Sequence, residues 1–157
     1  MCIMRKIVNF TIVVATVLTL LSCGSVKYLP VSVSQRQSFS NYKYAYVDTY
    51  NSHGTYSIHG CDVVAGLLMK KGFVILSYNQ YLNMSASTAY NTMKVTYGEG
   101  GTRSVGFTGG YTREVTLQFV SAATNDLICV CTAEGMGSTE RDDAEVAVTR
   151  CIQRLFP

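Results

Sequence analysis

Residues 111–135 read YTREVTLQFVSAATNDLICVCTAEG, and this stretch decides the fold. Val115, Leu117 and Phe119 alternate with polar residues, which is typical of a strand with one buried face. The polar segment ATND, residues 123–126, then reverses the chain. The following LICVCTA is apolar on both faces, as in a central strand. The stretch therefore predicts an antiparallel hairpin in the middle of a sheet.

The residues after the hairpin predict a helix. Ser138 or Thr139 can cap its start. Acidic residues follow in the first turn and arginines in the last, as the helix dipole favours. Its apolar residues recur at intervals of three and four, at Ala144, Ala147, Val148, Cys151, Ile152 and Leu155.

Shorter elements precede the hairpin. YKYAYVDTY, residues 42–50, alternates as a strand does, and HGCDVVAGLLMKKG, residues 59–72, has helical spacing that ends at Gly72. The segments between are expected as a buried strand at 73–78, a loop or a helical turn at 79–91, and a strand at 92–99. A Gly-rich stretch follows at 98–110, with a short strand at 103–107.

This order of elements predicts an α+β fold. We expect a two-layer domain over residues 42–157, with an antiparallel or mixed sheet and two helices on one face. With 48% apolar and 15% charged residues, the composition is that of one globular domain.

The N-terminus reads as a secretory signal. Arg5 and Lys6 precede an uncharged apolar run over residues 7–21, which is shorter than a membrane span requires. LLSCGS, residues 20–25, resembles the lipobox of bacterial lipoproteins. The resemblance implies cleavage after Ser22, a diacylglyceryl thioether on Cys23 and an amide-linked acyl chain such as palmitate. We expect a signal peptide at 1–22 and a lipidated, Ser-rich tether at 23–41.

The charge of the chain excludes a nucleic-acid partner. Lys and Arg number 13 against 10 Asp and Glu, and loss of the signal leaves 11 against 10. No basic patch remains that could bind phosphates. No cofactor motif was found, so the expected partners are the membrane, through the lipid, and an envelope protein or glycan.

Four cysteines remain for the domain, namely Cys61, Cys129, Cys131 and Cys151. Cys129 and Cys131 share one face of a strand and cannot easily bond to each other. Any disulfide would therefore join one of them to Cys61 or Cys151, in a compartment where disulfides persist. Four buried free thiols are the alternative, and the sequence leaves both open.

The stretch HGTYSIHGCD, residues 53–62, gathers the residues that could do chemistry. Its helix loosely resembles the cysteine-bearing helix of secreted cell-wall endopeptidases, but those enzymes place a base histidine downstream. No histidine follows His59, so Cys61 lacks a base. His53, His59, Cys61 and Asp62 match no metal-ligand spacing. We therefore assign no catalytic residue and no metal ligand, and expect that the protein is not an enzyme.

Gly135 and Gly137 lie between a strand and a helix, as in a dinucleotide-binding fingerprint. Glu140 stands at the third glycine position, and Asp142 and Asp143 would put negative charge where a pyrophosphate must lie. These glycines are therefore expected to form a tight turn.

Three tyrosines form the candidate binding surface. Tyr42, Tyr44 and Tyr46 alternate along one strand and share a face. Such a row can bind a glycan or a peptide, or can be an ordinary face of a sheet.

Five segments together resemble a family of short bacterial envelope lipoproteins of unknown function, common in the Bacteroides group. They are LLSCGS, YKYAYV, DVVAGLLMKKGF, YTREVTLQFVSAATNDLI and the closing TAEG…DDAEVAVTR. The resemblance implies an outer-membrane lipoprotein, facing the periplasm because no acidic run follows Cys23. Its expected function is a non-catalytic binding or assembly accessory. The alternatives are a cell-wall hydrolase using Cys61 and a purely structural envelope protein.

Overall fold

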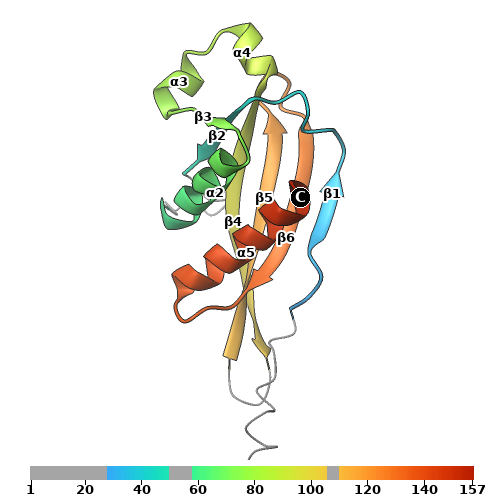
Figure 1. Ribbon diagram of the computed structural model, residues 1–157, viewed down its shortest axis with the longest axis vertical. Helices are drawn as coiled ribbons and strands as arrows, with labels where there is room; N and C mark the ends of the chain where they lie inside the picture. The colour runs from blue at the N-terminus through green and yellow to red at the C-terminus, as the bar shows by residue number, and fades with distance from the viewer. Residues whose placement is uncertain (1–27, 50–57, 106–109) are drawn as a thin grey trace, which may run out of the picture.

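The computed structural model describes residues 28–49, 58–105 and 110–157. A sheet of six strands, in the order β1-β6-β5-β4-β2-β3, forms one layer (Figure 1). The strands are β1 (Ser32–Gln35), β2 (Tyr44–Asp48), β3 (Val74–Ile75), β4 (Thr92–Val105), β5 (Gly110–Ser121) and β6 (Leu127–Gly135), and the described helices are α2 (Ile58–Lys70), α3 (Tyr78–Leu82), α4 (Ala86–Tyr90) and α5 (Glu140–Leu155).

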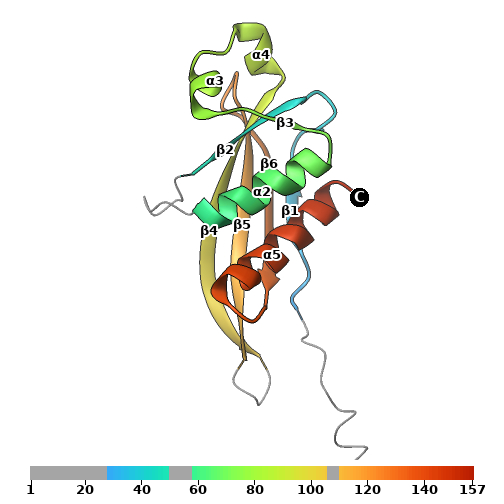
Figure 2. The same ribbon diagram turned by 60° about the vertical axis from the view of Figure 1, so that its left-hand side comes forward.

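The sheet is mixed. Strands β4, β5, β6 and β1 pair antiparallel in turn, whereas β2 runs parallel to both β4 and β3. Helices α2 and α5 cover one face of the sheet, and α3 and α4 lie beyond one of its ends (Figure 2). The predicted α+β fold, with a mixed sheet and two helices on one face, is confirmed.

The predicted hairpin forms the centre of the core. Leu117 pairs with Cys131 and Phe119 with Cys129 across β5 and β6, and all four side chains are fully buried under the helices. Asn125 lies in the turn with a φ of 60°, a left-handed conformation that asparagine tolerates. The alternation read from the sequence therefore marks the face that α5 covers.

Both long helices have the predicted ends. The side chain of Thr139 accepts a hydrogen bond from the amide of Asp142 and caps α5. Gly72 ends α2 with a φ of 91°, and the amide of Phe73 donates to the carbonyl of Leu68 at 3.1 Å. This is the hydrogen-bond pattern of a Schellman cap, which glycine adopts without strain.

Residues 73–91 differ from the prediction. The strand expected at 73–78 is reduced to the two residues of β3, at the edge of the sheet. Ser77 begins α3 instead, because its side chain accepts from the amide of Gln80 while Gln80 binds the amide of Ser77. The expected loop at 79–91 holds most of α3 and all of α4.

The Gly-rich stretch also differs from the prediction. Strand β4 is continuous over 14 residues, rather than two separate strands at 92–99 and 103–107. A bulge between Glu99 and Thr102 absorbs the glycines without ending the pairing with β5. Beyond this bulge, residues 102–105 and 110–112 project past the end of β6 (Figure 1) and are called the arm below.

The tether expected at 23–41 is wrong over its second half. Residues 32–35 form β1 and pair with β6, so the domain extends back to Tyr28 and does not begin at Tyr42. All four side chains of β1 are exposed. The strand is held by backbone hydrogen bonds to β6. Its one apolar residue, Val33, is exposed, so the strand has no buried apolar face that would mark it in the sequence.

The segment before β1 is fixed to the sheet by Glu134. The amide of Leu29 donates to Glu134 Oε2 at 3.0 Å, and Arg103 of the arm donates to both carboxylate oxygens at 2.8 and 2.7 Å. Arg150 of α5 donates to the carbonyl of Leu29 at 2.8 Å and lies 4.5 Å from the ring centre of Tyr28. These five residues are called the Glu134 cluster below.

Gly135 allows α5 to approach the sheet backbone. A Cβ atom at this position would lie 1.9 Å from the carbonyl oxygen of Asp143 and 2.6 Å from the amide nitrogen of Ala147. Both atoms belong to helix backbone, which cannot move aside as a side chain can. Gly135 is therefore a packing requirement of the strand-to-helix connection.

We predict that Gly135→Ala lowers the free energy of unfolding by about 2–3 kcal/mol, because α5 must shift away from β6. Chemical denaturation measures the change. Gly101→Ala is the matched control, since Gly101 is exposed and an added Cβ would meet no atom within 4 Å. Equal stability of the two variants would contradict this account of Gly135.

Candidate functional site

A cavity of about 790 Å³ opens between β2, the first turns of α2 and α3. It exists because β3 pairs only with Tyr44 and Ala45, which leaves the rest of that edge of β2 uncovered. This cavity is called the tyrosine cleft below. Its aromatic, ionisable and thiol side chains used in the argument are Tyr46, Asp48, Cys61, Tyr78, Tyr81 and Lys94.

Three tyrosine rings form one wall of the tyrosine cleft. Tyr46 and Tyr81 stack with ring centres 4.2 Å apart and planes 18° from parallel. Tyr78 lies 6.3 Å from Tyr46 and is 60% exposed. Burial raises the pKa of Tyr46, with a further contribution from the charge of Asp48, so its phenol stays neutral. The wall therefore offers one free aromatic ring backed by a fixed pair.

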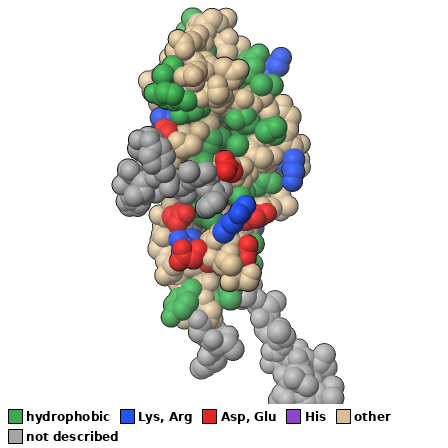
Figure 3. All heavy atoms as spheres, turned by 90° about the vertical axis from the view of Figure 1, so that its left-hand side faces the viewer, with side chains coloured by type: hydrophobic (Ala, Val, Ile, Leu, Met, Phe, Trp, Pro, Cys, Tyr) green, Lys and Arg blue, Asp and Glu red, His purple; other side chains and the backbone are tan. Residues whose placement is uncertain are grey.

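An ion pair lies beside the aromatic wall. Lys94 Nζ lies 2.8 Å from Asp48 Oδ2, across the parallel pairing of β2 with β4. Asp62 adds an exposed carboxylate from the second turn of α2. On the described part of the face shown in Figure 3, acidic and basic side chains are intermixed without a patch of one sign. The site combines aromatic surface with paired hydrogen-bonding groups.

Cys61 lines the tyrosine cleft, but its side chain is buried in the core. Its side chain is 4% exposed, and its thiol donates to the backbone carbonyl of Asp48 at 3.1 Å. Burial raises the pKa of this thiol to about 11, and the charges of Asp48 and Asp62 add to the rise. The thiol is therefore protonated at neutral pH, which is the opposite of an activated nucleophile.

The other three described thiols are also buried and free. Burial raises the pKa of Cys129 to about 11. Cys151 donates a hydrogen bond to Cys131, which raises the pKa of Cys151 and lowers that of Cys131. Of the pairings considered from sequence, the structure brings Cys131 and Cys151 together as thiols, between β6 and α5.

The three tyrosines expected to form one surface have separate surroundings. Tyr42 precedes β2 and packs against the core, with its hydroxyl donating to Gln37 Oε1 at 3.3 Å. Tyr44 lies under the ammonium group of Lys43, 5.6 Å from its ring centre. Only Tyr46 reaches the tyrosine cleft, where its neighbours are Tyr78 and Tyr81. The partners of Tyr46 thus come from α3, which the sequence analysis did not assign.

Three side chains weighed in the sequence analysis cannot be placed. His53 and Cys23 lie outside the described residues, as does the side chain of His59. Among the side chains that the structure describes, no three His, Cys, Asp or Glu residues come together in a group that could hold a metal ion. No helix within this part of the chain has the length and apolar content needed to cross a bilayer.

Solved structures with a similar fold exist, whereas no protein-family model and no curated protein matches the chain. PelC of Paraburkholderia phytofirmans, solved as a dodecamer, is similar with a TM-score of 0.57 and 12% identity, over 81% of this chain and 97% of PelC. A PDZ domain protein from Parabacteroides distasonis is similar with a TM-score of 0.51 and 11% identity, over 92% of this chain and 40% of that protein. At these identities the likeness shows the fold alone.

We predict that Cys61, Cys129, Cys131 and Cys151 do not react with a thiol reagent in the native protein at pH 7, and react once the protein is unfolded. All four are buried, which blocks access of the reagent, and burial also raises the pKa of Cys61 and Cys129 to about 11. Alkylation followed by mass spectrometry of the peptides measures this. Rapid labelling of Cys61 before unfolding would contradict the placement of its thiol, and labelling that also needs a reductant would reveal a disulfide.

Proposed function

We propose that the chain is a membrane-anchored, non-catalytic binding accessory of the bacterial cell envelope, and that the tyrosine cleft holds an uncharged glycan. The observation that carries the proposal is the exposed ring of Tyr78 beside the stacked Tyr46 and Tyr81, in one cavity with the Lys94–Asp48 ion pair. A pocket with apolar walls and a few converging polar groups is the usual form of a small-ligand site.

The chemistry of a sugar fits these groups. A sugar ring has an apolar face of C–H groups, which packs on an aromatic ring, and a rim of hydroxyls that donate and accept hydrogen bonds. The face of Tyr78 can pack against the apolar face of the sugar, and Lys94 and Asp48 can hydrogen-bond to its hydroxyls. Because Lys94 is already paired and Asp62 adds negative charge, the tyrosine cleft disfavours phosphate and other anions.

The envelope location is supported by the N-terminal sequence. Residues 1–22 resemble a signal peptide, and LLSCGS resembles a lipobox. We therefore propose Cys23 as the lipid attachment site, on the periplasmic side of the outer membrane. The lipid then attaches the protein to the bilayer, and the described domain carries the site that meets a partner.

The burial of Cys61 favours binding over catalysis at this site. A nucleophile needs an accessible, ionisable group and a base to activate it. Cys61 is buried, its pKa is raised to about 11, and its thiol donates to a backbone carbonyl. A cell-wall hydrolase that uses Cys61 is therefore the weaker proposal.

An assembly role is the second candidate. It is favoured by the likeness to a chain that was solved as a dodecamer. Light scattering of the detergent-solubilised protein measures its oligomeric state and separates the two candidates. A monomer supports the binding accessory, and an oligomer supports the assembly role.

We predict that uncharged oligosaccharides bind the protein and that Tyr78→Ala weakens their binding at least about tenfold, equal to about 1.4 kcal/mol, because the free ring is lost. Calorimetric titration of the detergent-solubilised protein with N-acetylglucosamine tetramer and neutral glucan oligomers measures the affinity. The sugars should be recovered uncleaved.

Tyr90→Ala is the matched control, because Tyr90 is 68% exposed on α4 and does not line the tyrosine cleft. It should bind as the wild type does. Equal losses in the two variants, cleavage of the sugars, or binding of extended peptides with no binding of any uncharged sugar would contradict the proposal.

A further inference from the structure

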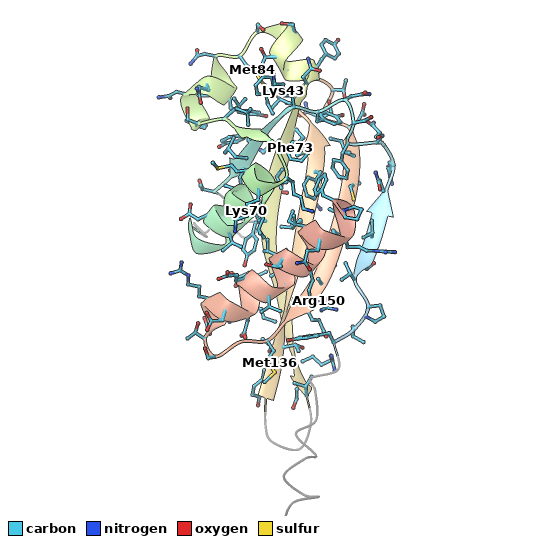
Figure 4. The ribbon with its side chains drawn as sticks, in the orientation of Figure 1. Lys43, Lys70, Phe73, Met84, Met136 and Arg150 are labelled. Carbon is cyan, nitrogen blue, oxygen red and sulfur yellow. The ribbon has the colours of Figure 1, made fainter. Side chains whose placement is uncertain are left out.

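The Glu134 cluster fixes the N-terminal segment at one end of the molecule. Besides the contacts of Leu29, the hydroxyl of Tyr28 donates to the carbonyl of Met136 at 3.3 Å. Met136 packs beside the arm, since a Cβ atom on Gly110 would lie 2.6 Å from its methyl group. Figure 4 shows Met136 at the arm end of the domain and Met84 at the opposite end. The chain toward Cys23 therefore departs from the arm end.

The link from this point to the lipid attachment site is short. Only Gly24, Ser25, Val26 and Lys27 separate Cys23 from Tyr28. A fully extended chain covers at most about 3.6 Å per residue, so Tyr28 stays within about 18 Å of Cys23. The full tether expected from sequence would have reached several times farther and would have left the domain free to turn.

We propose that the arm end of the domain rests on the lipid headgroup surface and that the end bearing α3 and α4 points away from the membrane. The inference rests on the proposed lipid anchor at Cys23. Because Tyr28 and Leu29 are bonded to β6 and α5, the anchor holds one end of a rigid body. This orientation leaves the α3 wall of the tyrosine cleft on the side where a glycan partner can reach it.

The surface chemistry of the arm end suits a lipid headgroup layer. Leu29 is 52% exposed and Tyr111, at the arm, is 60% exposed. Tyrosine favours the interface between water and lipid, where its ring and hydroxyl are both satisfied. The charges here are largely paired, Arg103 with Glu134 and Arg113 with Glu99 and Glu140. The contact should therefore not depend on anionic lipid.

The test measures the depth of two labelled positions in the lipidated protein. Ser104→Cys on the arm and Ala86→Cys on α4 are both exposed, whereas the native thiols of the domain are buried. Each variant carries a fluorophore and is bound to phosphatidylcholine vesicles that contain a headgroup-quencher lipid. We expect several-fold stronger quenching at position 104 than at position 86, and the same result with phosphatidylglycerol added.

Flotation with the vesicles and mass spectrometry of the Cys23 peptide are measured first. A protein that is not lipidated or does not float overturns the anchor and this inference with it. A protein that floats but shows equal quenching at both positions overturns the orientation alone. An arm label that is shielded without lipid quenching would place a protein, or a second copy of the chain, on this end and would also overturn it.

A variant with a lengthened link tests the cause of the orientation. Inserting about ten Gly and Ser residues between Ser25 and Val26 adds a flexible spacer and leaves the Glu134 cluster intact. The difference in quenching between positions 104 and 86 should then shrink markedly. A difference that persists in full would show that the short link does not orient the domain, and would overturn the argument from its length.

Discussion

The carboxylate of Glu134 joins parts of the chain that are distant in sequence. It accepts hydrogen bonds from Arg103 of the arm and from the amide of Leu29, which lies more than a hundred residues away. Its own backbone carbonyl accepts from Arg150 of α5, and Arg150 also binds Leu29. Strand β6, the arm, α5 and the N-terminal segment are therefore held as one unit at this end.

This arrangement keeps a buried charge satisfied. Glu134 is 5% exposed, and a carboxylate removed from water without partners would be strongly unfavourable. The hydrogen bonds from Arg103 hold its pKa at about 2, against the opposing effect of burial. Loss of Arg103 would leave the charge with only neutral partners among those that hold its pKa down, the amide of Leu29 and the hydroxyl of Thr112. The same contacts decide where the N-terminal segment leaves the domain, so the position of a lipid anchor depends on them.

The sequence predicted the elements that carry their own periodicity. The hairpin of β5 and β6 and the helix α5 follow from the alternation of Val115, Leu117 and Phe119 and from the cap at Thr139. Strand β1 could not be predicted in this way, because its four side chains, Val33 included, are exposed and the strand is held by its pairing with β6. Helix α3 did have a local signal, since Ser77 and Gln80 form a capping box.

The tyrosine cleft was only partly visible in the sequence. Tyr46 was a candidate, but its stacking partner Tyr81 lies 35 positions later, on a segment read as loop. Lys94 and Asp48 meet because β2 and β4 are parallel neighbours, which depends on the topology of the whole sheet. Cys61 was weighed as a nucleophile from its place near a helix start, and the tertiary structure turns it into the core. A site made of residues that only the tertiary structure brings together can be identified only once the fold is known.

The pH dependence of stability tests the role of Glu134 most directly. A carboxyl with a pKa of about 2 in the folded state and about 4.3 when unfolded stabilises the fold fully above pH 5. That contribution is lost as the pH falls from 5 toward 2. We expect the free energy of unfolding of the wild type to fall over this range by about 2 kcal/mol more than that of Glu134→Gln. Glu145→Gln, at an exposed position of α5, should follow the wild type. An identical pH profile for the wild type and Glu134→Gln would contradict the account.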